Sequence, residues 1–499
     1  MTASSPTQGL APARVGTGIE GLDDILAGGF TEHRLFLIEG APGSGKTTLA
    51  TQFLFEGVRR GEPVLYVTLS ETEDELHEMA RSHGWSLDGI TIRELVPSEE
   101  SLLPDDQYTM FHPSEVELSE TTKSVLADVE RTAPRRVVFD SLSELRLLAG
   151  NPLRFRRQIL ALKQFFTGRQ CTVLLLDDLV GSEPDMQVHS LAHGVVRLEQ
   201  LCPEYGAERR RLSISKFRGS NFRGGYHDFV ILKGGIRVFP RLVASEHEAV
   251  SGMETLPSGL GQLDALLGGG MHRASSTLIM GAAGTGKSTI ASQFVAAAAE
   301  RGQRSALFIF DESVNTLLTR CAGLGIDLRR HVESGLVSIR QVDPGELAPG
   351  EFVEAIRRSV DEDQAVIVVI DSLNGYLNAM PGEKFLIIQL HELLSYLGQM
   401  NVATVLIGAH QGLIGSQMIS PVDVSYLADA VILMRYFEAE GELRQAISVV
   451  KKRGGEHERT IRELKLADAQ IVVGPPLRNF RGVLTGVPII ENGAKKADS

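Results

Sequence analysis

Short runs of apolar residues alternate with amphipathic segments along the whole chain. The runs at 34–40 (RLFLIEG), 63–69 (PVLYVTL), 135–141 (RRVVFDS) and 171–178 (CTVLLLDD) each have the length of a buried strand. Between them, 45–61 (GKTTLATQFLFEGVRRG) and 72–84 (TEDELHEMARSHG) have the pattern of helices, and Thr72 and Glu75 have the spacing of a capping box. Continuous apolar strands separated by helices are typical of a parallel sheet covered on both faces. The pattern predicts a doubly wound α/β fold.

The last part of the first half has a different pattern of apolar and polar residues. After the run 193–200 (HGVVRLEQ), the segments 209–219 (RRRLSISKFRG) and 229–239 (FVILKGGIRVF) alternate as hairpin strands do, with a turn at Gly234 and Gly235. The second half of the chain shows the same succession in the runs 305–310, 365–371, 402–408, 430–437 and 446–454. Each half is therefore expected to be a mainly parallel sheet that finishes in hairpins.

The two halves are copies of one another. An offset of 241 residues takes Lys46 to Lys287 and Glu71 to Glu312, without a gap over about fifty residues, and later it falls slightly, so that Lys216 matches Lys451. A tandem duplication of a unit of about 230 to 240 residues explains this match. We expect a flexible N-terminus at 1–13, a first domain at 14–245, a second domain at 246–487 and a short polar tail at 488–499.

Composition narrows the class of protein. The net charge of −13 favours solubility and opposes tight non-specific binding to DNA or to an anionic membrane. The three cysteines, Cys171, Cys202 and Cys321, are too few and too scattered for a disulfide framework or a zinc cluster, which favours a reducing compartment. No apolar run has the form of a signal peptide or a transmembrane helix, so a cytoplasmic protein is expected.

Two glycine-rich loops carry the chemistry. GAPGSGKTT at 40–48 and GAAGTGKST at 281–289 both match G-x-x-x-x-G-K-[ST], and both follow a predicted strand and open a predicted helix. Such loops wrap backbone N–H groups around nucleotide phosphates. Lys46 and Lys287 would reach the β- and γ-phosphates, and Thr47 and Ser288 would hold Mg²⁺. The context favours nucleotide loops over glycine turns with an incidental lysine.

Carboxylates follow the neighbouring strands. Asp140 and Asp371 end apolar strands at the place of a Walker B acid, a role that the loops favour over a simple helix cap. Hydrolysis also needs a base that orients or deprotonates water. The candidates are Glu71 in TLSE, and Asp311 with Glu312 in IFDE. The alternative, acids that stabilise the first turn of a helix, remains open on sequence alone.

Each half also has a Lys-x-Arg pair, Lys216 with Arg218 and Lys451 with Arg453. Residues two apart on a strand share a face, so each pair aims two cations in one direction. The pair suits a phosphate clamp that reaches into a neighbouring subunit. A solvated edge strand with protective charges is the alternative.

Taken together, these motifs resemble the KaiC family, the cyanobacterial clock ATPase and its prokaryotic relatives. GIEGLDDILAGGF (18–30), EMARSHGWSLDG (78–89), KFRGS (216–220), KKRGG (451–455) and RNFRGVLTGVP (478–488) add to the doubled unit, and the resemblance covers about residues 14 to 487. It implies two tandem RecA-like P-loop NTPase domains of the α/β class, ATP and Mg²⁺ as cofactors, and a homohexamer of two stacked rings with ATP at subunit interfaces.

The resemblance also extends the set of site residues. The implied ATP-binding residues are Gly43, Ser44, Gly45, Lys46, Thr47, Thr48, Ser82, Lys216, Phe217, Arg218, Gly284, Thr285, Gly286, Lys287, Ser288, Thr289, Lys451, Lys452 and Arg453. Metal ligands are expected at Thr47, Ser288 and Asp311, and catalytic acids at Glu71, Asp311 and Glu312. The family has two adjacent acids after the second strand, but the first unit has Ser70 before Glu71, which leaves Glu71 as its one local candidate.

Clock members of the family phosphorylate themselves in the second ring. In the matching stretch, DVSYLADAVILMRYF, Ser425 takes the serine position and Tyr426 the threonine position, while the first unit has His189 and Ser190 there. The resemblance makes Ser425 and Tyr426 candidate phosphosites, although an unmodified loop serine would look the same. No two-step serine–threonine cycle is expected.

These observations predict an ATP-hydrolysing double ring with a serine/threonine autokinase in its second domain, which acts as a signalling or clock-type switch on a KaiB-like or other signalling protein. A RecA-class DNA recombination or helicase motor is a second hypothesis. The acidic charge and the lack of an aromatic–basic stretch disfavour it. A scaffold that nucleotide holds together without turnover is the third.

Overall fold

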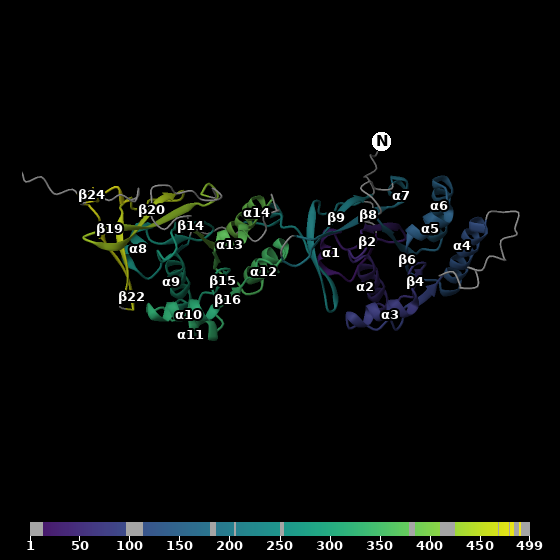
Figure 1. Ribbon diagram of the computed structural model, residues 1–499, viewed down its shortest axis with the longest axis horizontal. Helices are drawn as coiled ribbons and strands as arrows, with labels where there is room; N and C mark the ends of the chain where they lie inside the picture. Colours follow the sequence, from purple (N-terminus) through teal and green to yellow (C-terminus); the bar gives the residue numbers. More distant parts are fainter. Residues whose placement is uncertain are drawn as a thin grey trace, which may run out of the picture. The chain divides into compact units, whose positions relative to one another are not determined.

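The computed structural model describes residues 13–95, 113–179, 186–203, 206–249, 254–378, 385–409, 425–467, 469–478, 480–483 and 489–490. The chain divides into two compact units between Arg241 and Leu242 (Figure 1). Each unit is built on one large sheet flanked by helices, so the predicted doubly wound α/β fold is confirmed. No helix in the described ranges is both long enough and apolar enough to span a membrane.

The sheet of the first unit has parallel strands that continue into hairpins. Its order is β11 (Gly235–Phe239), β10 (Tyr226–Leu232), β9 (Arg209–Phe217), β8 (Gly194–Leu201), β3 (Leu35–Gly40), β7 (Thr172–Asp178), β6 (Arg136–Asp140), β4 (Val64–Thr68) and β5 (Thr91–Glu94). The strands from β8 to β5 are parallel, and β9, β10 and β11 extend the sheet as antiparallel neighbours. Both the parallel part and the C-terminal hairpins agree with the sequence pattern.

Helices cover both faces of this sheet. They are α1 (Glu20–Ile25), α2 (Lys46–Arg59), α3 (Glu73–Ser82), α4 (Pro113–Thr132), α5 (Leu142–Ala149), α6 (Pro152–Gly168) and α7 (Met186–Leu191), and a small ribbon joins β1 (Arg14–Val15) to β2 (Phe30–Thr31). Ile38 of β3 belongs to one core with Phe53 of α2, and Leu37 belongs to the other with Ile159 of α6. Successive residues of one strand thus enter opposite cores, as a doubly covered sheet requires.

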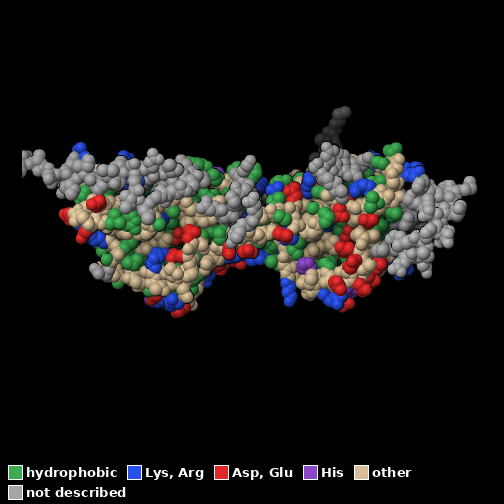
Figure 2. All heavy atoms as spheres, viewed as in Figure 1, with side chains coloured by type: hydrophobic (Ala, Val, Ile, Leu, Met, Phe, Trp, Pro, Cys, Tyr) green, Lys and Arg blue, Asp and Glu red, His purple; other side chains and the backbone are tan. Residues whose placement is uncertain are grey.

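The start of α3 shows how local sequence sets an element. The Thr72 side chain accepts from the N–H of Glu75, and the Glu75 carboxylate accepts from the N–H of Thr72, which confirms the predicted capping box. Three acidic residues, Glu73, Asp74 and Glu75, form the first turn, where the helix dipole favours negative charge. Figure 2 shows acidic side chains gathered over this part of the unit.

The second unit repeats the arrangement. Its sheet order is β16 (Val337–Gln341), β15 (Ser305–Ile309), β17 (Ile367–Asp371), β18 (Ala403–Ala409), β14 (Ser276–Gly281), β19 (Ala430–Ala439), β20 (Glu442–Lys452), β21 (Arg462–Ala467) and β22 (Gln470–Pro476). Its helices are α8 (Gly261–Leu266), α9 (Lys287–Glu300), α10 (Val314–Gly323), α11 (Leu328–Glu333), α12 (Pro349–Asp361), α13 (Leu373–Asn378) and α14 (Leu386–Gln399), with the 3-10 turn η3 (Ala244–Glu246) before them. Short ribbons pair β12 (Thr255–Leu256) with β13 (Met271–His272) and β23 (Phe480–Arg481) with β24 (Ile489–Ile490).

Candidate functional site

Both glycine-rich loops lie at the carboxyl end of a central strand and lead directly into a long helix. β3 ends at Gly40 and α2 begins at Lys46, and the same loop joins β14 to α9 in the second unit. The φ angles of Gly43 and Gly45 are +78° and +99°, in the left-handed region that favours glycine. Gly284 and Gly286 repeat these values at +79° and +93°. Each loop therefore directs a helix N-terminus at the same edge of its sheet.

The side chains of the two loops differ in their partners. The Ser44 hydroxyl is buried and lacks a hydrogen-bond partner in the described part of the chain, whereas Thr285 Oγ1 donates to the Ala282 carbonyl at 2.9 Å. Thr48 and Thr289 lie in the first turn of α2 and α9, and both are buried. The unpaired buried Ser44 hydroxyl is available to a bound phosphate.

The two loop lysines have different surroundings. Lys46 Nζ donates to the Gly40 carbonyl at 2.9 Å and lies 2.7 Å from Asp178 Oδ1. Asp178 ends β7, and the register of β3 with β7 places it opposite Gly40. In the second unit the residue opposite Gly281 is Ala409, and Lys287 Nζ donates to the Ala282 carbonyl at 2.8 Å.

Asp178 was not singled out by the sequence. The available signal was the acid at the end of the apolar run 171–178, the same kind of signal that identified Asp140. It supplies a carboxylate for the loop lysine in the first unit, and the matching Ala409 in the second cannot.

The Walker B candidates lie beside the hydroxyl that follows each loop lysine. Thr47 Oγ1 donates to Asp140 Oδ2 at 3.2 Å, and Tyr66 Oη donates to the same oxygen at 2.7 Å. Burial raises the pKa of Asp140. Burial also raises the pKa of Asp371, from an ordinary value of 3.8 to about 6, although a hydrogen bond from Ser288 opposes the rise. A hydroxyl beside a poorly hydrated carboxylate is a ligand set that suits Mg²⁺.

The raised pKa of Asp371 predicts how pH affects the second unit without nucleotide. A carboxyl whose pKa is higher in the folded state stabilises the fold below its unfolded pKa, and that stabilisation is lost as pH rises through the folded pKa. Between about pH 4.5 and 7, the free energy of unfolding of the wild-type second unit should fall by about 2 kcal/mol relative to Asp371→Asn. Denaturant titration of the two chains at each pH measures this difference.

Asp363→Asn, which replaces an exposed carboxylate, is the matched control and should keep the wild-type pH slope. An identical slope in wild type and Asp371→Asn would contradict the prediction.

The first unit's candidate base is a carboxyl group with a raised pKa. Glu71 follows β4, and its backbone carbonyl accepts a hydrogen bond from Thr68 Oγ1 at 2.7 Å. Burial raises the pKa of Glu71, and the neighbouring charges of Asp140, Glu75 and Asp178 add to the rise.

In the second unit both candidate acids are held by hydrogen bonds. Arg320 of α10 forms an ion pair with Glu312 at 2.6 Å and donates to Thr289 Oγ1 at 2.8 Å. Ser372 Oγ donates to Asp311 Oδ2 at 2.6 Å. The repeat matches Arg320 with Met79, so this arginine contact is specific to the second unit. The sequence did not identify it, because an arginine in mid-helix is common on exposed faces.

The Lys-x-Arg pairs lie toward the opposite end of the strands from the loop of their own unit. Leu198 is opposite Gly40 at the loop end of β8, whereas Lys216 is opposite Val195 near the strand's start. Arg218 donates to the Ser190 carbonyl at 2.9 Å, and Lys216 donates to the carbonyl of His189. The structure therefore does not bring the pair to the phosphate loop of its own unit.

The second pair makes the same kind of contacts. Lys451 Nζ donates to the carbonyls of Ser425 and Ala428, at 2.8 and 2.7 Å, and Arg453 donates to the Tyr426 carbonyl at 2.7 Å. The backbone of both candidate phosphosites is thus fixed by the two cations.

Three other residues of the implied ATP-binding set face elsewhere. The Phe217 ring is buried in the core. Lys452 donates to the Leu267 carbonyl. Ser82, which ends α3 and is exposed, donates to the Met79 carbonyl at 2.7 Å. These contacts do not bring the three side chains to the phosphate loop of their own unit, and their role as nucleotide ligands stays a prediction.

Comparison with known proteins agrees with the geometry of the two loops. The family model for the KaiC ATPase matches residues 15–243 and 256–478. The circadian clock protein KaiC3 of Synechocystis is 28% identical over 481 residues, which cover 95% of this chain and 94% of the relative. The circadian clock oscillator protein KaiC of Synechococcus elongatus is 28% identical over 484 residues, which cover 96% and 92%. The chain therefore belongs to the KaiC ATPase family, with one family domain in each unit.

Proposed function

We propose that the chain hydrolyses ATP in both units as a double-ring homohexamer, in which each Lys-x-Arg pair reaches the phosphates bound at the loop of a neighbouring copy. The observation that supports this most directly is the placement of loop and pair at opposite ends of the same strands. A head-to-tail contact brings such opposite ends together, and repetition of that contact closes a ring. The six-fold number comes from the family resemblance.

Within each site the roles follow from the contacts described. Lys46 and Lys287 bind the β- and γ-phosphates, which requires Lys46 to leave Asp178. Thr47 with Asp140, and Ser288 with Asp371 and Asp311, would hold Mg²⁺, which neutralises phosphate charge when bound. Glu71 in the first unit and Glu312 in the second orient the attacking water and accept its proton.

Assembly is the first test of this function. In Mg-ATP the wild-type chain should give a hexamer by native mass spectrometry, because the phosphates join loop and pair across each contact. Replacing the four cations of the two pairs with alanine should weaken the ring, whereas Lys465→Ala, which removes an exposed lysine of β21, should leave it intact. A wild-type monomer at saturating ATP would contradict the ring.

A second activity, autophosphorylation of Ser425, is favoured by the hydrogen bonds of its backbone. Because Lys451 and Arg453 donate to the carbonyls of Ser425 and Tyr426, phosphates that the pair reaches would lie near these hydroxyl groups. The first unit has His189 in place of Ser425, with its ring 2.6 Å from Glu39, and Ser190 in place of Tyr426. We therefore assign the autokinase role to the second unit, and phosphorylation would act as a switch toward a KaiB-like or other signalling protein.

Phosphosite mapping after incubation with Mg-ATP tests this activity. Phosphate is expected on Ser425 and should be absent in Ser425→Ala and in Lys287→Ala, which lacks the loop lysine of the second unit. Ser334→Ala, which replaces an exposed serine of that unit, is the control and should keep the phosphate. Absence of phosphate from both Ser425 and Tyr426 would leave an ATPase without autokinase activity.

A further inference from the structure

A cluster of aromatic rings fills the amino-terminal end of the first unit's sheet. The rings of Phe36 and Phe217 are stacked with their centroids 5.6 Å apart. His193 lies edge-on to Phe36 with the ring centroids 5.7 Å apart, and the centroid of Phe30 lies 4.5 Å from that of Phe36. All three phenylalanines are buried. The three phenylalanines belong to the hydrophobic core of the first unit.

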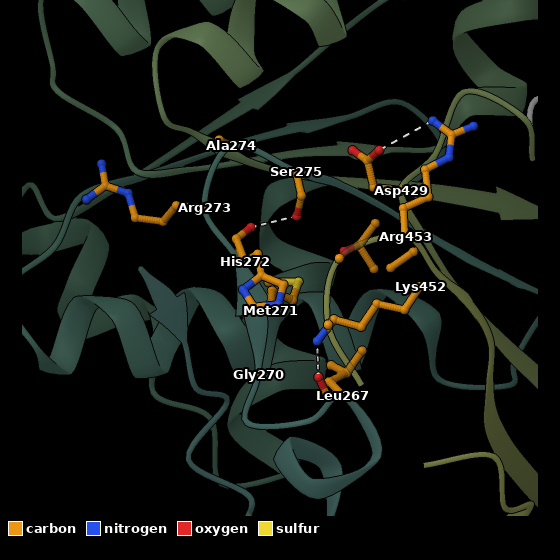
Figure 3. A pocket seen from close by; sticks show the side chains of 14 residues that line it. Leu267, Gly270, Met271, His272, Arg273, Ala274, Ser275, Asp429, Lys452 and Arg453 are labelled. Atoms are coloured by element: carbon orange, nitrogen blue, oxygen red, sulfur yellow. Dashed lines mark hydrogen bonds and ion pairs between the residues drawn. The ribbon is translucent and has the colours of Figure 1, made fainter. Parts of the chain in front are cut away.

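The second unit replaces every member of the cluster. In the first unit Gly194 pairs with both Phe36 and Phe217. In the second unit Ala430 pairs in the same way with Thr277 and Lys452, so Thr277 takes the position of Phe36 and Lys452 that of Phe217. By the same offsets Asp429 replaces His193, and Met271 replaces Phe30. Loss of the rings leaves a cavity of about 420 Å³ lined by these four residues and their neighbours (Figure 3). That volume is within the usual range of small-molecule sites.

Lys452 brings a positive charge to this cavity. Its side chain extends beside His272 and Met271 and donates to the Leu267 carbonyl (Figure 3). Partial burial lowers the pKa of Lys452, and none of the described carboxylates forms an ion pair with it. A partly buried ammonium without a counter-charge costs free energy, which a bound anion would offset.

The other charged groups of the lining already have partners. The Asp429 carboxylate accepts from the Ser276 N–H at 3.0 Å and lies 3.5 Å from Arg453. Arg273 points away from the cavity in Figure 3 and contacts Glu254 at 2.8 Å. Lys452 is therefore the cation that the cavity offers to a ligand.

We propose that this cavity binds a small organic monoanion with a flat apolar body, whose charged group pairs with Lys452. We infer a flat ligand because stacked aromatic rings occupy the matching position in the first unit. We infer an apolar ligand because Leu267, Met271 and Ala430 contribute apolar side chains to the lining. Arg453 of the Lys-x-Arg pair also lines the cavity, but its guanidinium contacts the Tyr426 carbonyl and Asp429, so the proposal pairs the ligand's charge with Lys452. It does not depend on ATP hydrolysis.

Equilibrium dialysis of the full chain with 2-naphthoate, in saturating Mg-ATP, tests the proposal. One molecule of 2-naphthoate should bind per chain, at least tenfold more tightly than the neutral isostere 2-naphthamide. Lys452→Met keeps the length of the side chain and removes its charge, so it should weaken 2-naphthoate binding at least tenfold and abolish the preference over the amide. Thr277→Phe restores one ring of the sister unit and should abolish binding of both molecules.

Lys465→Met removes an exposed lysine of the same unit and is the matched control, which should bind 2-naphthoate as wild type does. Retention of labelled-ATP binding at the first unit shows that each variant is folded there, and the far-ultraviolet circular dichroism reports on the second unit. Unchanged binding in a folded Thr277→Phe variant or an equal affinity for the amide would each overturn the proposal. Absence of binding at millimolar 2-naphthoate would also overturn it.

Discussion

Replacing Glu71 and Glu312 together with glutamine is expected to lower phosphate release by roughly 10²- to 10⁴-fold, the usual contribution of a general base. Glutamine keeps the shape of the side chain but cannot accept a proton from water. The glycine-rich loops and their lysines are unchanged, so binding of a labelled ATP analogue should persist. Steady-state phosphate release and analogue binding, measured on the same preparation, separate the two effects.

Single replacements divide the activity between the units. In Glu312→Gln the remaining turnover belongs to the first unit, and it should fall as pH decreases, because Glu71 must be ionised to act as a base. Since the pKa of Glu71 is raised, that fall should begin at a higher pH than for an ordinary glutamate. Glu73→Gln replaces an exposed acid at the start of α3 and should leave turnover unchanged. Full turnover in the double variant would rule out both proposed bases.

Exchanging Asp178 and Ala409 between the units is expected to reverse the relative affinity of the two ATP sites. Lys46 and Asp178 are 8% and 30% exposed, so their ion pair is partly shielded from water, and ATP must break it. Separating them and keeping a carboxylate close to the phosphates costs on the order of 1–3 kcal/mol. Asp178→Ala should therefore tighten binding at the first site by roughly tenfold to hundredfold, and Ala409→Asp should weaken the second by a similar factor.

Each site can be measured alone with a fluorescent ATP analogue. The first is read in a Lys287→Ala background and the second in a Lys46→Ala background, since each background removes the loop lysine of the other unit. Asp88→Ala removes the same charge from an exposed turn and controls for net charge. If Asp178→Ala binds the analogue no more tightly than Asp88→Ala, the ion pair does not limit binding.

The sequence alone predicts those parts of the fold that depend on interactions between residues close together in the chain. The apolar runs predict the central strands, the Thr72 capping box predicts the start of α3, and the glycine-rich motifs predict loops that lead from a strand into a helix. The duplication predicts that each half is a mainly parallel sheet that finishes in hairpins, and both sheets have this form with the same strand order. In each case the signal lies within a few residues or in the repeat itself.

Contacts between distant strands could not be predicted in the same way. The run at 171–178 indicates a buried strand, but only its packing beside β3 places Asp178 opposite Gly40 and within reach of Lys46. The cavity of the second unit likewise depends on residues of two strands. Thr277 of β14 is small and Lys452 of β20 is charged, and both side chains line the same cavity. Such coincidences depend on strand order and register, which side-chain packing across the sheet determines.

The separation of loop and Lys-x-Arg pair within one copy has a consequence for the cell. In the proposed ring a solitary chain carries both halves of an ATP site but can complete neither, because the halves lie at opposite ends of its strands. Turnover per molecule would then climb with the abundance of the protein until the rings are saturated. If the ring forms as proposed, the activity of each chain would depend on the concentration of the protein, and dilution alone would abolish it.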